Sequence, residues 1–433
     1  MSAPETSAGK KHGQDWKRWN EEGREMIVAY IDPGTGSMLF SLVIGAVAAV
    51  TFGLRALILK LKYGFNREKA AEEEKSAYKY VIFSDHKRYW NVFEGICREF
   101  ERRGIDVKYY TLSQDDPVFS CGFKHIDAEY LGEGNRPYST LNFLSADIVL
   151  ATTPNLDVYQ WKRSRNVKWY VHVPHTVDDL SGYRMFGLDH YDAVLTTGDN
   201  QIETARKLEE LRPSITRKEL VTVGSTTLDA LMEKLEKKGR HVRTDDRLTV
   251  LLAPTWGPSG ILSRFGDRLL SELEKTGYNV IVRPHPQSLS SEKELVDKLK
   301  ASHKGIEWNS DNDNFDVLNR ADVLITDFSG IIFDFSLVFD KPVIYADTSF
   351  DPIIYDADWL NDEYWSIRIL PELGLKLTEE NFSGVGELVK EAVGSSRLTE
   401  GRKRIGEICY QRRGESAVLS VDYLVSKQKV LSV

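Results

Sequence analysis

The sequence predicts an α/β protein with two Rossmann-like domains, because short apolar strands alternate with helices in two separate series. We expect the strands of the first series at residues 80–84, 107–112, 147–152, 169–173, 193–196 and 220–223. The strands of the second series are expected at residues 248–253, 279–282, 322–326 and 342–345. Nearly continuous apolar strands between helices are typical of parallel sheets that are covered on both faces.

Helices are expected at residues 92–103, 201–211, 264–276, 291–301 and 330–338, and the stretch 381–429 also has a helical pattern. The charged segment 233–247 separates the two series of strands. We therefore divide the chain into a polar leader (1–32), a membrane helix (33–59), a linker or stalk (60–77) and two Rossmann-like domains (78–240 and 241–425).

The membrane helix is predicted from residues 33–54, a run of 22 residues without Asp, Glu, Lys or Arg. A helix needs roughly 20 such residues to cross the hydrocarbon core. A buried core helix is the first alternative, but no amphipathic partner surrounds the run. A cleaved signal peptide is the second, and the long charged leader before the run argues against it. We therefore expect a single-pass protein of the cell membrane.

The side of the membrane is not decided by charge, because five Lys or Arg residues lie on each side, in 1–25 and in 55–69. The three cysteines favour a cytoplasmic globular part, since they are far apart and show no disulfide pattern. They also lack the spacing of a Cys-based zinc site. No carboxylate pair of the DxD type stands at the end of a predicted strand, so we expect no metal and no cofactor.

Composition narrows the range of partners. The chain has 57 Lys and Arg against 65 Asp and Glu, a formal net charge of −8, which argues against a nucleic-acid binder. The hydrophobic share of 41% and the charged share of 28% exclude a wholly disordered chain. The sequence contains neither a GxxxxGK[ST] loop nor a GxSxG elbow, which argues against a P-loop nucleotidase and against a standard hydrolase.

The strongest candidate site lies in residues 322–335, DVLITDFSGIIFDF, where a predicted strand turns into a helix. The turn carries Thr326, Asp327, Ser329 and Gly330. A helix start with unpaired N–H groups is suited to phosphate, and a glycine lets an anion approach the backbone. The alternative is that Asp327 and Ser329 are ordinary helix caps.

Two other strand ends in the second domain carry candidate residues. Arg283 and His285 follow the strand in NVIVRPHP, where Arg283 could neutralise a phosphate and His285 could bind or protonate one. A lone loop histidine with satisfied hydrogen bonds is the alternative for His285. Thr255 in LLAPTWG could contact a phosphate or a base, while the neighbouring Trp256 could belong to the core. Residues 224–227, GSTT, form a further strand end at the close of the first domain.

The first domain offers histidines and carboxylates near its strand ends. In KWYVHVPHTVDD, residues 168–179, Pro174 favours His175 in a loop and His172 inside the sheet. Asp178 and Asp179 either orient a histidine or cap the next helix. Asp85 follows the first strand in SDH.

Taken together and in order, these strings resemble the CDP-glycerol glycerophosphotransferase family of teichoic-acid-type polymerases and primases. The resemblance covers roughly residues 78–425. The family strings "APTW", "R-x-HP" and "TD-[YF]-S-S/G-x-x-FD" correspond to residues 253–256, 283–286 and 326–334. The family's "WHGTPLK"-like string is matched best at His175, without its Gly, Pro and Lys, and Gly257 stands where an Arg often follows "APTW".

The resemblance implies the GT-B arrangement, with a cleft between an N-terminal acceptor domain and a C-terminal nucleotide-donor domain. It further implies the membrane-associated transfer of glycerol phosphate, or a related alditol phosphate, from its CDP-activated donor. The acceptor would be a hydroxyl of a lipid-linked or polymeric molecule of the cell envelope, and CMP would be released.

The resemblance also assigns roles to the candidate residues. His175 would be the catalytic base, and His285 would stabilise the leaving phosphate. The expected donor-binding residues are Thr255, Arg283, Thr326, Asp327, Ser329, Gly330 and Asp334, of which Asp334 either binds ribose or is a solvated helix carboxylate. Asp85 and His172 are candidates for the acceptor side.

Two other functions stay open on the sequence. A GT-B glycosyltransferase that uses a nucleotide sugar would need the same pyrophosphate site in its second domain. An inactive membrane-tethered scaffold is the other alternative, and the altered string around His175 supports it.

Overall fold

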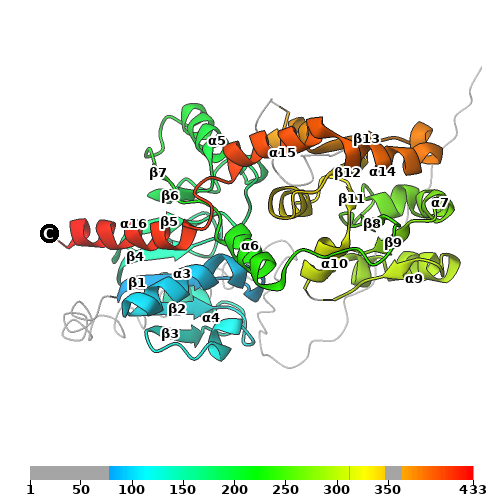
Figure 1. Cartoon of the computed structure of the whole chain (residues 1–433). Helices are drawn as coiled ribbons and strands as arrows, with labels where there is room; N and C mark the ends of the chain where they lie inside the picture. The colour runs from blue at the N-terminus through cyan, green and yellow to red at the C-terminus, as the bar shows by residue number, and fades with distance from the viewer. Residues whose placement is uncertain (1–77, 312, 347–362, 433) are drawn as a thin grey trace, which may run out of the picture. The chain divides into compact units, whose positions relative to one another are not determined.

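The computed structural model describes residues 78–311, 313–346 and 363–432, and these residues contain two parallel β-sheets (Figure 1). The first sheet has seven strands: β1 (Tyr78–Ser84), β2 (Val107–Thr111), β3 (Ile126–Tyr130), β4 (Ala146–Ala151), β5 (Val167–His172), β6 (Ala193–Thr196) and β7 (Glu219–Thr222). The second has six: β8 (Thr249–Leu252), β9 (Asn279–Val282), β10 (Glu307–Trp308), β11 (Val323–Thr326), β12 (Val343–Ala346) and β13 (Gly374–Leu377).

Both sheets have the strand order of a Rossmann fold. The first runs β3-β2-β1-β4-β5-β6-β7 and the second β10-β9-β8-β11-β12-β13. In each sheet the order reverses after the first strand, so the chain crosses over between β1 and β4 and between β8 and β11. Ligands of doubly wound sheets bind beyond the carboxyl ends of the strands at such a reversal.

Side chains on the strands of the first sheet alternate between two buried layers. Tyr80 and Ile82 pack with helix α3 (Trp90–Arg103), whereas Val81 and Phe83 pack on the opposite face. This period of two is the geometry of an extended strand, and both of its faces are apolar here because both are covered. The other helices of this domain are α4 (Arg136–Leu141), α5 (Asp199–Leu211) and α6 (Thr226–Lys238), with short turns η2 (Lys87–Tyr89), η3 (Pro117–Ser120) and η4 (Leu180–Gly182).

The second sheet is covered in the same way. Val250 and Leu252 face helices α7 (Ile261–Lys275) and α9 (Lys293–Ser302), and Leu251 faces α10 (Phe315–Arg320). The remaining elements are α8 (Ser288–Ser291), α11 (Ile331–Phe333), the π-helical turn η5 (Asp334–Val338), α12 (Trp365–Arg368), α13 (Leu370–Leu373), η7 (Glu379–Gly384), α14 (Val385–Gly394) and α15 (Ser396–Cys409).

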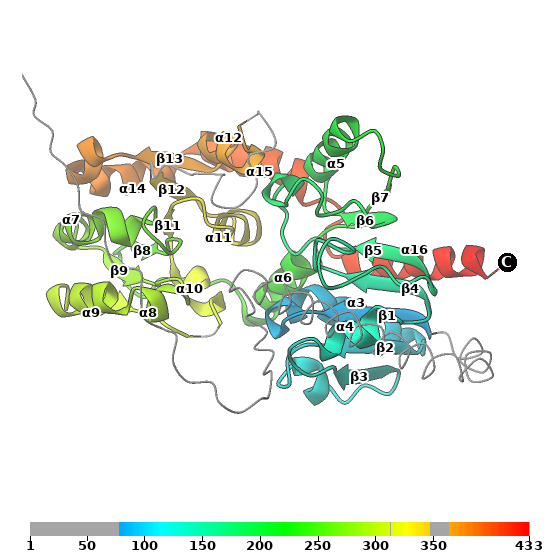
Figure 2. The same ribbon diagram turned by 180° about the vertical axis from the view of Figure 1, so that it is seen from behind.

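The last helix, α16 (Ser416–Leu431), returns to the first sheet, where Val421 and Leu424 join the core beside α3 (Figures 1 and 2). Asp229 of α6 fastens the connection that leads into this helix. Its carboxylate accepts hydrogen bonds from the Tyr410 hydroxyl at 2.7 Å and from the backbone N–H groups of Gly414 at 2.8 Å and Ser416 at 3.1 Å. The predicted boundary at residues 240 and 241 lies in the other connection, between α6 and β8.

The ten predicted strands are present with shifts of at most two residues, but the sequence did not indicate β3, β10 and β13. All three are edge strands. β3 alternates buried and exposed residues and β10 has only two residues, so neither has the continuous apolar pattern of the inner strands. The predicted helix 291–301 begins as the separate short helix α8, and the predicted helix 330–338 is a short α-helix followed by a π-helical turn.

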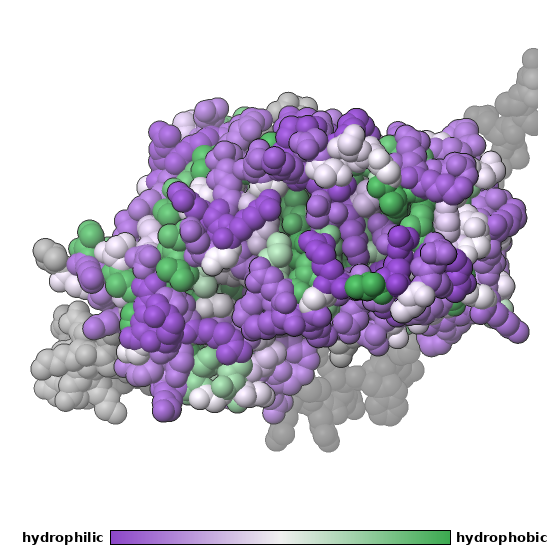
Figure 3. Space-filling model, viewed as in Figure 1, coloured by the Kyte–Doolittle hydropathy of each residue, from purple (hydrophilic) through white to green (hydrophobic). Residues whose placement is uncertain are grey.

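The expected location, a single-pass protein of the cell membrane with a cytoplasmic catalytic part, requires correction. Among the residues that the structure describes, no helix has both the length and the apolar character needed to cross a membrane. The run 33–59, from which the location was predicted, lies outside the described residues. On the face of the molecule seen in Figure 3, apolar side chains are scattered among polar ones.

Gly198 provides a test of how the α5 start packs against the end of α15. A Cβ at Gly198 would overlap the carbonyl oxygen of Ile408 and lie 2.8 Å from Cα of Cys409. The backbone N–H of Gln411 also donates to the Thr197 carbonyl at 3.0 Å in this region. We expect Gly198→Ala to lower the free energy of unfolding by about 2 kcal/mol, because overpacking forces the backbone to shift.

Urea denaturation of the full chain measures this effect. Gly394→Ala is the matched control, since a Cβ there would meet no atom within 4 Å. An equal stability of the two variants would contradict the predicted contact.

Candidate functional site

Asp327 links the two strand ends at the reversal point of the second sheet. Its side chain follows β11 and is buried, at 1% exposure. The carboxylate accepts the backbone N–H of Thr255, after β8, at 2.9 and 3.1 Å, and that of Ile261 at 3.4 Å. Burial raises the pKa of Asp327, and the N–H donors oppose that rise. Asp327 therefore fixes both ends of the loop 255–261.

Two positions of this loop, Gly257 and Gly260, favour glycine for different reasons. Gly257 has a φ of +94°, which L side chains rarely adopt, and a Cβ at Gly260 would lie 2.6 Å from the Thr255 carbonyl oxygen. Trp256, which immediately precedes Gly257 in this loop, is 48% exposed. The alternative that Trp256 belongs to the core is therefore wrong.

Glu292 is a second carboxylate at this edge, and the sequence did not single it out. It accepts hydrogen bonds from the Ser263 and Ser288 hydroxyls, each at 2.6 Å, and its charge opposes the lowering of the His285 pKa. The sequence could have indicated Glu292 only through its position, just before helix α9 and seven residues after His285.

Arg283 and His285 follow β9, as predicted. The Arg283 guanidinium donates to the Asn309 side chain and, at 2.8 Å, to the Asp311 carbonyl oxygen. These partners follow the edge strand β10, which explains why the sequence did not reveal them. His285 Nδ1 accepts the backbone N–H of Gln287 at 3.1 Å, so the neutral ring carries its proton on Nε2. Burial lowers the pKa of His285 and favours this neutral form.

The turn after β11 holds the remaining predicted donor residues. Thr326 is buried and its hydroxyl donates to the Ala253 carbonyl at 2.7 Å, a bond between neighbouring strand ends. Ser329 is half-buried and Gly330 is exposed. A Cβ at Gly330 would meet no atom within 4 Å, and its φ of −58° suits any residue. Burial raises the pKa of Asp334, at the start of η5, to about 7.

In the first sheet, His172 and His175 occupy the positions that Pro174 predicts. His172 is the last residue of β5 and fully buried, with Nε2 at 3.1 Å from the Tyr183 hydroxyl. His175 lies in the following loop, and its ring centroid is 5.1 Å from that of Tyr89. Burial lowers the pKa of His172 to about 3 and, with the nearby Arg88, also lowers that of His175. Both rings are therefore neutral at pH 7.

Polar atoms without partners gather at these strand ends. Within the described part of the chain, six buried atoms here lack a hydrogen bond: Asp85 Oδ1, Thr152 Oγ1, Thr153 Oγ1, His172 Nδ1, His175 Nδ1 and Thr197 Oγ1. They follow or end β1, β4, β5 and β6. A buried polar atom without a partner costs about 1–3 kcal/mol, so such a concentration indicates a place where a ligand or water completes the bonds.

The carboxylates of Asp178 and Asp179 both accept backbone N–H groups close by in the chain, that of Asp178 accepting the Asp179 N–H at 2.8 Å. Asp179 caps η4 through the Ser181 N–H at 3.3 Å. Burial, with the neighbouring Asp179, raises the pKa of Asp178 to about 7. Gln201 fixes the same loop by donating to the Thr176 and Asp178 carbonyls at 2.9 and 2.8 Å, and the sequence did not indicate this role.

The predicted residues thus form two groups. In the second domain, the Asp327 carboxylate accepts the backbone N–H of Thr255, and the Thr326 hydroxyl donates to the Ala253 carbonyl. In the first, His172 lies beside Tyr183 and His175 lies beside Tyr89. No hydrogen bond or ion pair joins the two histidine positions His175 and His285 among the described residues. In the same part of the chain, no group of three His, Cys, Asp or Glu side chains is placed to hold a metal ion.

Comparisons with known proteins support the resemblance seen in the sequence. Residues 188–359 match the family model of CDP-glycerol:poly(glycerophosphate) glycerophosphotransferases. Over 145 residues the chain is 29% identical to the minor teichoic acid biosynthesis protein GgaB of Bacillus subtilis (strain 168). This match covers 32% of the chain and only 14% of GgaB.

Solved structures show the same fold at low identity. The wall teichoic acid polymerase TagF superposes with a TM-score of 0.54 at 13% identity, over 89% of this chain and 98% of that one. The UDP-GlcNAc 2-epimerase from Neisseria meningitidis gives a TM-score of 0.52 at 15% identity, over 80% of this chain and 100% of that one. The chain therefore has a GT-B-like α/β fold.

The matched segment contains the strings at 253–256, 283–286 and 326–334, whereas Asp85, His172 and His175 precede it. In these strings and over residues 188–359, the chain is similar to the CDP-glycerol glycerophosphotransferase family.

Proposed function

We propose that the chain transfers glycerol phosphate, or a related alditol phosphate, from its CDP-activated form to a hydroxyl of a lipid-linked or polymeric cell-envelope acceptor. The observation that carries this proposal is the pair Arg283 and His285 at the end of β9, within the segment that matches the family model. In the reaction, the acceptor oxygen attacks the phosphorus that bears the alditol. The bond from this phosphorus to the bridging oxygen breaks, and CMP leaves with that oxygen.

The donor would bind at the reversal point of the second sheet. The turn at Ser329 and Gly330 would provide backbone N–H groups for its phosphates, beside the loop that Asp327 holds in place. Arg283 would pair with the pyrophosphate, because two of its N–H groups are already oriented by Asn309 and Asp311. Charge neutralisation and positioning supply most of the catalysis in phosphoryl transfer.

His285 would act on the leaving CMP. Because Nδ1 accepts the Gln287 N–H, the Nε2–H of the neutral ring is free to donate to the phosphate oxygen on which charge develops. The hydrogen bonds that Glu292 makes with Ser263 and Ser288 stabilise the helix start beside this ring.

His175 would remove the acceptor proton. A neutral imidazole accepts a proton, and both burial and the Arg88 charge keep this ring neutral. The unpartnered atoms of Asp85 and His172 would bind further hydroxyls of a polyol acceptor, since each can form one more hydrogen bond.

A donor panel tests the proposed reaction. We expect CMP release from CDP-glycerol or CDP-ribitol in the presence of a teichoic-acid-containing membrane extract, and a rate lowered about 100-fold by His285→Ala, as for the loss of one charge-stabilising donor. Chromatography of the released nucleotide measures both. Release of UDP or CDP from a nucleotide sugar would instead support glycosyl transfer, and no release from any donor would contradict the proposal.

His175 predicts a pH dependence. We expect His175→Ala to lower turnover by about 100-fold or more, because a general base contributes roughly 10²–10⁴-fold. In the wild type, a base with a lowered pKa stays deprotonated below the usual value of 6.5, so the rate should hold to lower pH before it falls. Initial rates of CMP release across about pH 5 to 8 measure this. His125→Ala removes an imidazole that pairs with Asp106 and is the control. An acid limb at or above the usual value, or near-normal turnover of His175→Ala, would exclude this role.

A substitution at Gly330 tests donor binding without disturbing the fold. Its surroundings leave room for a Cβ and its φ is helical, so Gly330→Ala should leave stability unchanged or raise it by up to about 1 kcal/mol. If a phosphate lies against this backbone, the same methyl group should raise KM for the CDP donor about tenfold or more. Thermal unfolding and donor-saturation kinetics give the two values, with Gly384→Ala, which is equally unobstructed, as the control. An unchanged KM would remove Gly330 from the donor site.

A further inference from the structure

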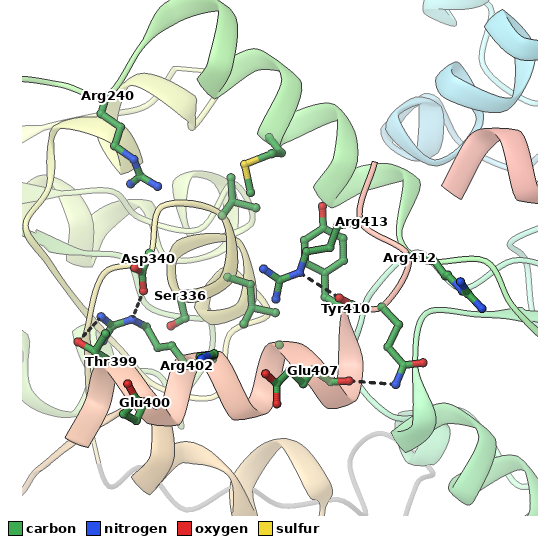
Figure 4. A pocket seen from close by; sticks show the side chains of 16 residues that line it. Arg240, Ser336, Asp340, Thr399, Glu400, Arg402, Glu407, Tyr410, Arg412 and Arg413 are labelled. Carbon is green, nitrogen blue, oxygen red and sulfur yellow. Dashed lines mark hydrogen bonds and ion pairs between the residues drawn. The ribbon is translucent and has the colours of Figure 1, made fainter. Parts of the chain in front are cut away.

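A cavity of about 830 Å³ lies among α6, the π-helical turn η5, α15 and the connection from α15 to α16 (Figure 4). None of its lining residues is among the catalytic, donor-binding or acceptor residues considered above. Its volume falls in the range of small-molecule sites, and it is large enough for a ligand with several phosphate groups.

The lining is richer in positive than in negative charge, although the chain as a whole is acidic. Five cationic side chains line the cavity, against three acidic ones: Arg240, Arg402, Lys403, Arg412 and Arg413. Arg240 follows the end of α6, Arg402 and Lys403 belong to α15, and Arg412 and Arg413 lie in the connection after α15. Figure 4 shows the four arginines around the cavity.

Most of this positive charge is not neutralised by carboxylates. Arg402 pairs with Asp340 at 2.8 Å. Arg240 instead donates to the Phe339 carbonyl, and Arg413 donates to the Tyr410 carbonyl at 3.1 Å. Among the described residues, no ion pair involves Arg240, Lys403 or Arg413. Guanidinium groups with unused N–H donors are suited to phosphate oxygens.

Ser336 supplies an independent observation. It lies in η5 at 1% exposure, it lines the cavity, and its hydroxyl has no hydrogen-bond partner within the described residues. Figure 4 shows it on the same side of the cavity as Asp340 and Arg402. A buried hydroxyl without a partner costs free energy, and an anionic oxygen in the cavity would accept a hydrogen bond from the Ser336 hydroxyl.

We propose that this cavity binds a multivalent phosphate-bearing anion, through Arg240, Lys403 and Arg413 and the hydroxyl of Ser336. The cavity touches both connections between the two sheets, because Arg240 follows α6 and Arg413 precedes α16. An anion bound there would therefore contact the segments that join the two domains. The proposed binding does not depend on the transfer reaction proposed above.

Calorimetric titration of the full chain tests the site, with pyrophosphate and CDP as probes at constant ionic strength. The chain carries Arg283→Gln, which removes the cation proposed for the donor pyrophosphate. We expect saturable binding, and a Kd at least tenfold higher after Arg240→Gln and Lys403→Gln together. Ser336→Ala should raise the Kd severalfold. Equal affinity for the two probes identifies the phosphates as the recognised group, and tighter binding of CDP identifies a nucleotide.

Arg404→Gln is the matched control, because Arg404 neighbours Lys403 on α15, pairs with Glu372 and does not line the cavity. Unliganded thermal unfolding verifies that each variant is folded. Binding that is absent, or that the cavity variants retain in full, overturns the proposal. CMP release by Arg240→Gln with Lys403→Gln in the wild-type Arg283 background reports separately on the transfer reaction.

Discussion

Parallel pairing is the constraint on which the rest of this structure depends. Every pair of neighbouring strands in the described part of the chain is parallel, so all strands of a sheet end at one edge. Each connection must then cross the sheet as a helix, which covers both faces and requires apolar side chains on both sides of every inner strand. Most side chains in the middle of the inner strands are apolar, and many of the polar ones lie at or just beyond the strand ends. Asp327 shows the consequence, since its buried carboxylate orders the loop after the neighbouring strand.

The two edges have contrasting electrostatics. The second domain offers a cation, backbone N–H groups and a neutral imidazole with a known tautomer, which are groups that suit a phosphate. The first domain offers neutral, desolvated histidines and polar atoms without partners, which suit the uncharged hydroxyl of an acceptor. Burial causes both properties of the first edge, because it disfavours imidazolium and excludes the water that would otherwise satisfy the polar atoms.

The two connections between the sheets are more than linkers. The carboxylate of Asp229 gathers donors from Tyr410, Gly414 and Ser416, and an apolar cluster that includes Leu228, Phe335 and Cys409 joins α6 to elements of the second domain. The cationic cavity lies at this junction. Although the chain as a whole is acidic, it places positive charge locally, at Arg283 and among the residues that line this cavity.

The sequence by itself determined the fold class, the inner strands and the strand-end strings that resemble the glycerophosphotransferase family. It could do so because inner strands are apolar on both faces and because the strings are contiguous in the chain. It did not reveal the edge strands β3, β10 and β13, whose patterns are short or half-exposed. It also left open whether Trp256 is buried, and it did not indicate the roles of Glu292, Gln201 and Asn309. Only the tertiary structure decided these, because each depends on a partner tens of residues away: Asn309 on Arg283, Gln201 on the loop after β5, and Glu292 on Ser263. Burial, which sets the protonation of His172 and His175, likewise exists only once the sheets are assembled.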